Sequence, residues 1–151
     1  DWDAQQRAVQ RVRETARTLG DHPALFAISV ANEIPVDIIR FYGHRRVEQF
    51  IDQLIHIVKA EAPECLVTYV NFPTTEFLTP SACDFDCFNV YVHDEDKFGL
   101  YLDRLQHIAG NRPLLLGEYG IDTIREGDVE QAQMLSRHLR QVDRHGLAGV
   151  W

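Results

Sequence analysis

Two hydrophobic periods alternate along the whole chain, and this alternation constrains the fold more than any other feature of the sequence. Segments with apolar residues at helical spacing are separated by apolar runs that have only the length of strands. The clearest helical segment covers residues 44–62 and is closed by Pro63. Strands and helices that alternate with short connections predict parallel strands joined by right-handed crossovers. The predicted fold class is therefore α/β.

The same periods place each element along the chain. Helices are predicted where the helical period persists, over residues 4–19, 44–62, 98–109 and 128–145, with a short helical turn between 74 and 81. Strands are predicted over the runs 25–31, 65–70, 85–92, 113–118 and 147–151. Gly20 is expected to end the first helix as a C′ residue, and Asp128 with Gln131 to form a capping box for the last. The nearly continuous apolar run at 25–31 indicates a strand covered on both faces.

Length and charge limit the classes of function. A chain of 151 residues has the size of one domain. Its net charge of −8 argues against nucleic acid and against an anionic membrane surface as partners. No apolar run approaches the roughly 20 residues of a membrane span. No signal peptide is visible at the polar start, so the sequence does not indicate a localisation.

The three cysteines allow a metal site as an alternative interpretation. Cys83 and Cys87, with His93 nearby, have a spacing that would allow a metal site. Cys65 and Cys87 lie in apolar strand-like runs, where a free cysteine behaves as a small hydrophobic residue. We therefore favour buried free thiols and expect no metal.

Polar side chains end four of the otherwise apolar strands, and they suggest where chemistry takes place. These groups are Asn32-Glu33, Asn71, Asn89 to His93, and Glu118-Tyr119. Both an open doubly wound sheet and a barrel fit the strand order, but no glycine-rich phosphate loop follows any strand, which disfavours a nucleotide-binding open sheet. In a parallel barrel the C-terminal strand ends open onto one face, where catalytic groups collect.

Two glutamates stand at such strand ends. A single glutamate after a strand is often a helix N-terminal residue or a salt-bridge partner. Glu33, however, follows a run of apolar and small residues, and Glu118 lies between Gly117 and Tyr119-Gly120, where small neighbours leave space for a ligand. Cleavage of a glycosidic bond needs such a carboxyl pair, one to protonate the leaving oxygen and one to attack the anomeric carbon.

Four segments together resemble the clan A retaining glycoside hydrolases. His22-Pro23 leading to Ser29-Val30-Ala31-Asn32-Glu33 is similar to their fourth strand, and Asn89-Val90-Tyr91 to their sixth. Gly117-Glu118-Tyr119-Gly120-Ile121-Asp122-Thr123 resembles the nucleophile segment at the seventh strand, and Gly149-Val150-Trp151 the eighth. The likeness is strongest to family 2, and within it to β-glucuronidases. It covers essentially the whole chain in order and spacing.

This resemblance implies a fold and a reaction. Residues 1–151 would be the C-terminal part of a (β/α)8 catalytic domain, from about the third helix to the start of the eighth strand. Glu33 would be the acid/base and Glu118 the nucleophile of a retaining β-glycosidase, with no cofactor. Asn32 would bind the sugar 2-hydroxyl, and Tyr91 would hydrogen-bond the nucleophile. Trp151 would form one wall of the sugar-binding site. The competing interpretations are a turn-forming Asn32, a packed strand aromatic at Tyr91 and a core Trp151.

Further candidates are less specific. Asn71 and His93 are candidate substrate contacts, although His93 also fits a cap of the following helix, and Tyr119 and Asp122 are candidate pocket residues. The other histidines fall on predicted helices or their ends and are expected at the surface: His44, His56, His107, His138 and His145.

Two departures from the family pattern leave the sugar open. Ile34 intervenes before Pro35, and the segment from His93 to Asp96 is unusually acidic. The partner is expected to be a carbohydrate, with β-glucuronide, β-galactoside, β-mannoside and β-glucan all open. The alternative function is a non-catalytic module that binds carbohydrate or scaffolds a larger glycan-processing protein. We also expect the isolated chain to be inactive, and either to self-associate through unpaired strand edges at 25–31 and at Trp151 or to fold poorly.

Overall fold

The structure is a computed structural model that describes residues 2–151 and divides into two compact units. The first unit contains the residues up to Val70 together with Phe77–Asp84, and the second contains Asn71–Glu76 with Phe85–Trp151. Helices and strands alternate in both units, as the hydrophobic periods predict.

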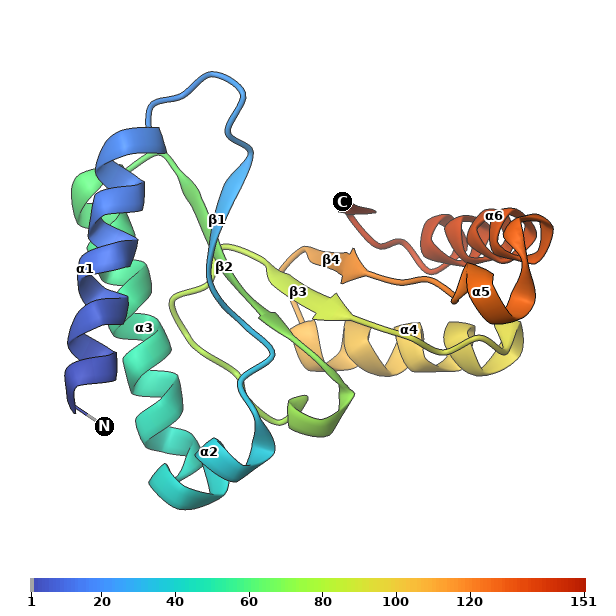
Figure 1. The fold of residues 1–151 in the computed structure, drawn as a ribbon, viewed down its shortest axis with the longest axis horizontal. Coiled ribbons are helices and arrows are strands. Elements are labelled where there is room, and N and C mark those ends of the chain that lie inside the picture. The colour runs from blue at the N-terminus through green and yellow to red at the C-terminus, as the bar shows by residue number, and fades with distance from the viewer. Residues whose placement is uncertain (1) are drawn as a thin grey trace. The chain divides into compact units, whose positions relative to one another are not determined.

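The first unit packs helices against a parallel pair of strands. Its elements are α1 (Trp2–Leu19), β1 (Ala27–Asn32), α2 (Val36–Tyr42), α3 (His44–Glu61) and most of β2 (Leu66–Asn71). β1 runs parallel to β2, and α1 lies side by side with α3 (Figure 1). The face of α3 that carries Ile51, Ile55 and Val58 is fully buried in the core of this unit. This face is the one that the spacing of apolar residues predicts.

The second unit repeats the same plan. It contains a 3-10 turn (Pro73–Thr75), β3 (Asp86–Asn89), α4 (Glu95–Ala109), β4 (Leu114–Glu118), α5 (Thr123–Glu126), α6 (Asp128–Arg144) and β5 (Gly149–Val150). β3 pairs in parallel with β4, and β4 with β5, while α4 and α6 pack against each other (Figure 1). Phe98, Leu102 and Leu105 of α4 are completely buried in its core. The parallel α/β prediction is confirmed.

Several local expectations are wrong. α2 and α5 were not predicted, and β3 ends at Asn89, before the end of the apolar run at residue 92. β1 begins at Ala27 and alternates in burial, with Ile28 and Val30 buried and Ser29 exposed, so the described chain does not cover it on both faces. Composition alone does not distinguish a strand covered on both faces from one covered on a single face.

Both predicted helix caps are also corrected. α1 ends at Leu19, directly before Gly20 as expected, but Gly20 does not have the positive φ of a C′ glycine. A Cβ there would lie 2.3 Å from the Cβ of Ala62, so Gly20 serves close packing of two helix ends. The N-cap of α6 is Gly127, with φ of 85°, and Asp128 is the first helical residue. Gln131 does not close a capping box, because its Nε2 donates to the backbone oxygen of Ile121 at 3.1 Å.

The cysteines are confirmed as buried free thiols. Cys65, Cys83 and Cys87 are all free and buried. Burial raises the pKa of the Cys87 thiol to about 12, with the carboxylates of Asp86 and Glu118 adding to the effect, so this thiol is inert at neutral pH. Among residues 2–151, no group of three or more His, Cys, Asp or Glu side chains is arranged to hold a metal ion.

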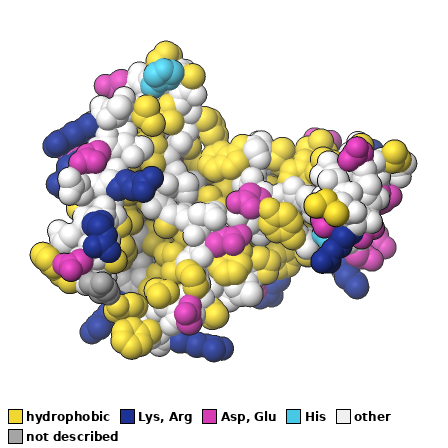
Figure 2. All heavy atoms as spheres, in the orientation of Figure 1, with side chains coloured by type: hydrophobic (Ala, Val, Ile, Leu, Met, Phe, Trp, Pro, Cys, Tyr) yellow, Lys and Arg dark blue, Asp and Glu magenta, His cyan; other side chains and the backbone are white. Residues whose placement is uncertain are grey.

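The surface shows mixed charge, and one histidine predicted to lie on it is buried instead. Lys and Arg side chains lie among Asp and Glu on the face shown in Figure 2. None of the helices in the described part of the chain has the length and hydrophobicity of a membrane span.

His138 was expected at the surface but is only 1% exposed. It falls on the buried face of α6 with Met134 and Val142, four residues away on either side.

Candidate active site

The segment Asn32-Glu33 leaves the C-terminal end of β1 and is held there by β2. The backbone N–H of Glu33 donates to the oxygen of Val70 at 2.9 Å. The next N–H, of Ile34, donates to the hydroxyl of Tyr69 at 3.1 Å, and Tyr69 is almost completely buried. The register of β1 against β2 shifts between Ser29 and Asn32. A bulge of this kind re-aims the side chains that follow it.

Glu33 has an unusual backbone conformation. Its φ is 47°, and it is the one residue other than glycine in the described range 2–151 with a positive φ. This conformation costs a residue with a side chain roughly 1–2 kcal/mol. Such strain persists only where surrounding contacts impose it, and it is concentrated at functional sites. The hydrogen bonds that Glu33 and Ile34 donate to β2 are the contacts that hold it here.

This strain predicts an unusual order of stability for two variants that both lack the carboxyl group. In the intact protein, Glu33→Gly is expected to be more stable than Glu33→Ala by about 1 kcal/mol, because glycine adopts a positive φ without steric cost. The matched pair Asp37→Gly and Asp37→Ala, on α2, should show the reverse order, since alanine is the better helix former. Denaturant unfolding measures both differences. An alanine variant at least as stable as the glycine variant at position 33 would contradict the observed φ.

Glu118 ends β4, and the chain beyond β3 brings Tyr91 to it. The hydroxyl of Tyr91 donates to Oε2 of Glu118 at 2.7 Å. Asn89 is the register partner of Glu118, and the N–H of Val90 donates to the Glu118 backbone oxygen at 2.8 Å, so the backbone positions both side chains. This pair is the hydrogen bond that the resemblance implies for a nucleophile.

A cavity of about 570 Å³ adjoins this pair within the second unit. Its lining comes from the segments after β3 and β4 and from the first turns of α6: Tyr91, His93, Tyr119, Gly120, Ile121, Asp122, Gln131 and Leu135. Asp122 accepts a hydrogen bond from the N–H of Ile124 and caps α5, while Gln131 holds the backbone of Ile121. These contacts fix the loop that follows Glu118.

His93 lines this cavity and does not cap the following helix. The N-cap of α4 is Asp94, whose carboxylate accepts a hydrogen bond from the N–H of Lys97 at 2.9 Å. The interpretation of His93 as a helix cap is therefore wrong. The structure places His93 with Tyr91, Tyr119 and Asp122 around one cavity.

Asn71 and Trp151 have different surroundings. Asn71 is buried, and its Oδ1 accepts hydrogen bonds from the N–H of Phe72 at 2.9 Å and from Oγ1 of Thr75 at 2.7 Å, which orders the turn after β2. Trp151 is 49% exposed, so it is not a core residue of this unit, and its indole contacts Phe85 edge to face at 6.1 Å.

Sequence reasoning missed some residues of the cavity and its support. Gln131, Leu135 and the buried His138 all come from α6. Position 138 repeats the apolar spacing of Met134 and Val142, and that spacing was the available signal for its burial.

Solved structures of larger proteins contain the same fold. A β-glucuronidase from Ruminococcus gnavus in complex with D-glucuronic acid is 17% identical, with a TM-score of 0.81 over 97% of this chain and 28% of its own. A Bifidobacterium dentium β-glucuronidase complexed with coumarin-3-O-glucuronide is 23% identical, with a TM-score of 0.73 over 94% and 27%. A family 2 β-galacturonidase from Eisenbergiella tayi bound to galacturonate is 20% identical, with a TM-score of 0.77 over 97% and 28%.

These likenesses show that the chain folds as part of a (β/α)8 TIM barrel and spans little more than a quarter of the length of those proteins. No curated protein matches the chain. A family model described as the TIM barrel domain of the family 2 glycosyl hydrolases matches residues 1–146. Because this match covers nearly the whole sequence, the chain belongs to the family 2 glycosyl hydrolases as part of their TIM barrel domain.

Proposed function

We propose that the intact protein is a retaining β-glycosidase in which Glu118 is the nucleophile and Glu33 the acid/base. The observation that carries this proposal is the hydrogen bond from Tyr91 to Glu118 at 2.7 Å, beside a cavity at the strand ends. The phenol fixes the orientation of the Glu118 carboxylate, and a nucleophile must be held in line with the atom that it attacks. A binding module gains nothing from a carboxylate prepared in this way.

The reaction then takes two steps. Glu33 donates its proton to the leaving oxygen while Glu118 attacks the anomeric carbon, which forms a glycosyl-enzyme and breaks the glycosidic bond. Glu33 then accepts a proton from water as that water attacks the same carbon, and Glu118 leaves, so the β configuration is retained. This mechanism requires the two carboxyl groups to lie about 5–5.5 Å apart in the intact protein.

The remaining site residues take part in binding under this proposal. Asn32 precedes Glu33 and would bind the hydroxyl next to the reacting carbon, an interaction that strengthens in the transition state. His93 reaches the sugar from the cavity wall, and the half-exposed Trp151 offers an apolar surface to a sugar face. Asn71 would act through the turn that it orders.

We further propose that residues 1–151 are the C-terminal part of the (β/α)8 catalytic domain and that the substrate is a β-linked sugar. The solved relatives hold glucuronate, a coumarin glucuronide and galacturonate, so β-hexuronides are the first substrates to test. Nitrophenyl β-galactoside, β-mannoside and β-glucoside complete the panel.

A mechanism-based label tests the proposal in the intact protein. A 2-fluoro derivative of the sugar that is turned over should form a stable ester with Glu118, visible as a modified peptide by mass spectrometry. Glu118→Gln should not be labelled, whereas Glu126→Gln, which removes an exposed glutamate on α5, should be labelled as efficiently as the natural protein. A label on another residue would overturn the assignment of Glu118. Sugar binding without label or turnover would favour the non-catalytic module.

A further inference from the structure

His138 occupies an unusual place beneath the candidate site. It lies on α6 and is 1% exposed. Its imidazole ring stacks on the ring of Phe98 from α4, with centroids 3.9 Å apart and planes 6° from parallel. On another side it meets Tyr119, the residue after Glu118, at a centroid distance of 6.2 Å. A histidine therefore holds a place where the core of this unit otherwise carries phenylalanine, leucine and valine.

Both ring nitrogens of His138 are buried and have no hydrogen-bond partner. The backbone carbonyl of His93 is near enough to favour a protonated ring, but it lies outside hydrogen-bonding geometry. Buried polar atoms without partners are rare in native proteins and call for an explanation. An apolar ring of similar size would fill the space without losing any hydrogen bond to water.

The charged groups around His138 do not compensate a proton on it. Burial lowers the pKa of His138, and Arg137 and His93 lower it further, while the His93 backbone and Glu95 of α4 oppose the shift. Arg137 is itself paired with Glu130 at 2.6 Å and, more loosely, with Glu95 at 3.9 Å. No carboxylate in the described residues is hydrogen-bonded to the ring of His138.

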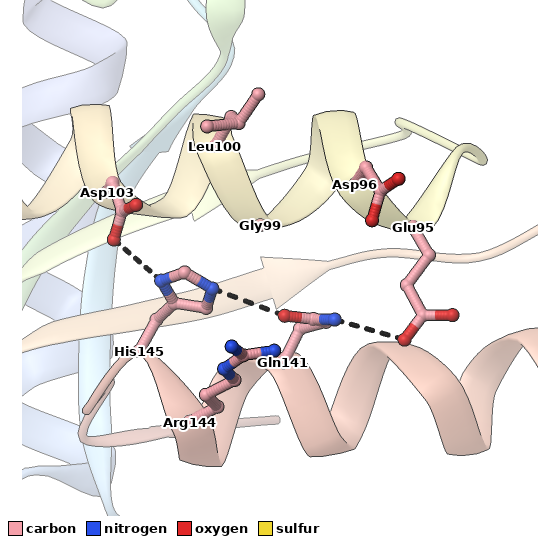
Figure 3. A pocket seen from close by; sticks show the side chains of 8 residues that line it. All are labelled: Glu95, Asp96, Gly99, Leu100, Asp103, Gln141, Arg144 and His145. Carbon is pink, nitrogen blue, oxygen red and sulfur yellow. Dashed lines mark hydrogen bonds and ion pairs between the residues drawn. The ribbon is translucent and has the colours of Figure 1, made fainter.

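The segments that follow β3 and β4 and carry the Tyr91–Glu118 pair lead to residues next to His138. Tyr119 directly follows Glu118, and His93 follows Tyr91 by two residues. A second contact between α4 and α6 extends from Glu95, two residues after His93, to the C-terminal end of α6. Figure 3 shows it as a line of hydrogen bonds, between His145 and Asp103 at 2.6 Å, between His145 and Gln141 at 3.2 Å, and from Gln141 to Glu95 at 3.0 Å.

We propose that His138 is a positioning residue for the Tyr91–Glu118 pair, and that its neutral, stacked ring is the state in which α6 supports this pair. Proton uptake by His138 places a buried cation between Phe98 and Tyr119, which the His93 carbonyl and Glu95 offset only in part. Separation of α6 from the ends of β3 and β4 relieves it by exposing the ring to water. The pair then loses its alignment and the reaction slows. This inference rests on the proposed role of Glu118 and adds an acid limit of activity set by a residue outside the cavity.

The direction of the pH effect follows from linkage. Because the pKa of His138 is lower in the folded protein than its ordinary value of 6.5, only the unfolded chain takes up the proton as pH first falls below about 6.5. His138 therefore has no effect on stability above that pH. Below it, this one group raises the unfolding constant by up to about tenfold per pH unit, until the folded ring is protonated as well.

Two variants of the intact protein test the proposal. His138→Phe keeps an aromatic stack but cannot take a proton, and the control His107→Phe makes the same change at an exposed position of α4. The unfolding constant is measured between pH 7.5 and 4.5. For the natural protein and His107→Phe it should rise as the pH falls below about 6.5. In His138→Phe the contribution of this histidine, up to about tenfold in the unfolding constant per pH unit, should be missing. The acid limb of kcat should move to lower pH in His138→Phe alone, with KM little changed.

Two results would overturn the proposal. One is an acid loss of stability in His138→Phe equal to that of the natural protein. The other is a changed stability profile with an unchanged acid limb of kcat, which would leave His138 a structural role only. Because the stability arm needs no activity, an inactive protein would count against the proposed function and not against the titration of His138.

A measurement without substitution covers the case in which His138→Phe does not fold. In the natural protein, hydrogen exchange corrected for the intrinsic effect of pH should speed up below about pH 6.5 in peptides covering residues 119–122 and 131–144. Peptides of α1 and α3 in the first unit serve as the control and should not change. Equal protection of α6 at pH 5 and pH 7.5 would refute the proposal.

Discussion

Under the proposed mechanism, replacing Glu118 by glutamine in the intact protein is expected to lower kcat by about 10⁴-fold or more for every β-glycoside tested as a substrate. The amide keeps the size of the side chain and still offers an oxygen to the hydroxyl of Tyr91. It cannot attack the anomeric carbon, so no glycosyl-enzyme forms. The loss should not depend on the leaving group, because the first step is blocked for all substrates. Steady-state kinetics on a panel of nitrophenyl and alkyl glycosides measures the loss.

Two companion variants show whether this loss is specific. Glu126→Gln removes a carboxylate from exposed α5 and should retain the full kcat. Tyr91→Phe removes only the hydrogen bond to Glu118 and should cost roughly 10- to 100-fold, the range of one hydrogen bond to a charged group. A Glu118→Gln variant that still turns over within tenfold of the natural protein would refute a nucleophilic role for Glu118.

Replacing Glu33 by alanine should produce a loss that depends strongly on the leaving group. Substrates with poor leaving groups need protonation, and their turnover should fall by about 10²- to 10⁴-fold, the usual contribution of general acid catalysis. A nitrophenyl glycoside needs little protonation, so its first step should survive and give a burst of nitrophenol. Hydrolysis of the glycosyl-enzyme then lacks a base, and the intermediate should accumulate on Glu118. Rapid mixing and intact-mass spectrometry detect the burst and the intermediate.

Azide distinguishes the two glutamates by stereochemistry. In Glu33→Ala the anion enters the vacated space, attacks the glycosyl-enzyme and should give a β-glycosyl azide of retained configuration. In Glu118→Gly the same anion replaces the nucleophile and should give the inverted product. Proton NMR of the isolated azides reads the configuration. If Glu33→Ala shows normal kinetics for poor leaving groups and no rescue, its assignment as acid/base is wrong.

The arrangement of helices and parallel strands follows from local properties of the sequence. Burial of one face gives each helix its apolar spacing, so the spacing of Phe98, Leu102 and Leu105 is enough to predict α4. The position of Glu118 at a strand end is equally local, since polar residues follow an apolar run there. Because parallel strands end at a common edge, the sequence also indicated that Tyr91, His93 and Glu118 belong to one region.

Short elements and special conformations depended on contacts between distant residues. α2 has seven residues and α5 has four, too few for a helical period to be recognised. The positive φ of Glu33 is imposed by hydrogen bonds to Val70 and Tyr69, which come from a different strand. No local property of residues 29–35 contains that information.

His138 shows the same limit most directly. Its residue type indicates a surface position, while its spacing from Met134 and Val142 indicates burial, and the sequence does not decide between them. The tertiary structure decided in favour of burial by placing Phe98 against one face of the ring and Tyr119 near another. The sequence by itself thus determined the parallel α/β fold and the candidate carboxylates, because hydrophobic periods and strand ends are local. The strain at Glu33, the Tyr91–Glu118 hydrogen bond and the burial of His138 were decided only by packing between segments far apart in the chain.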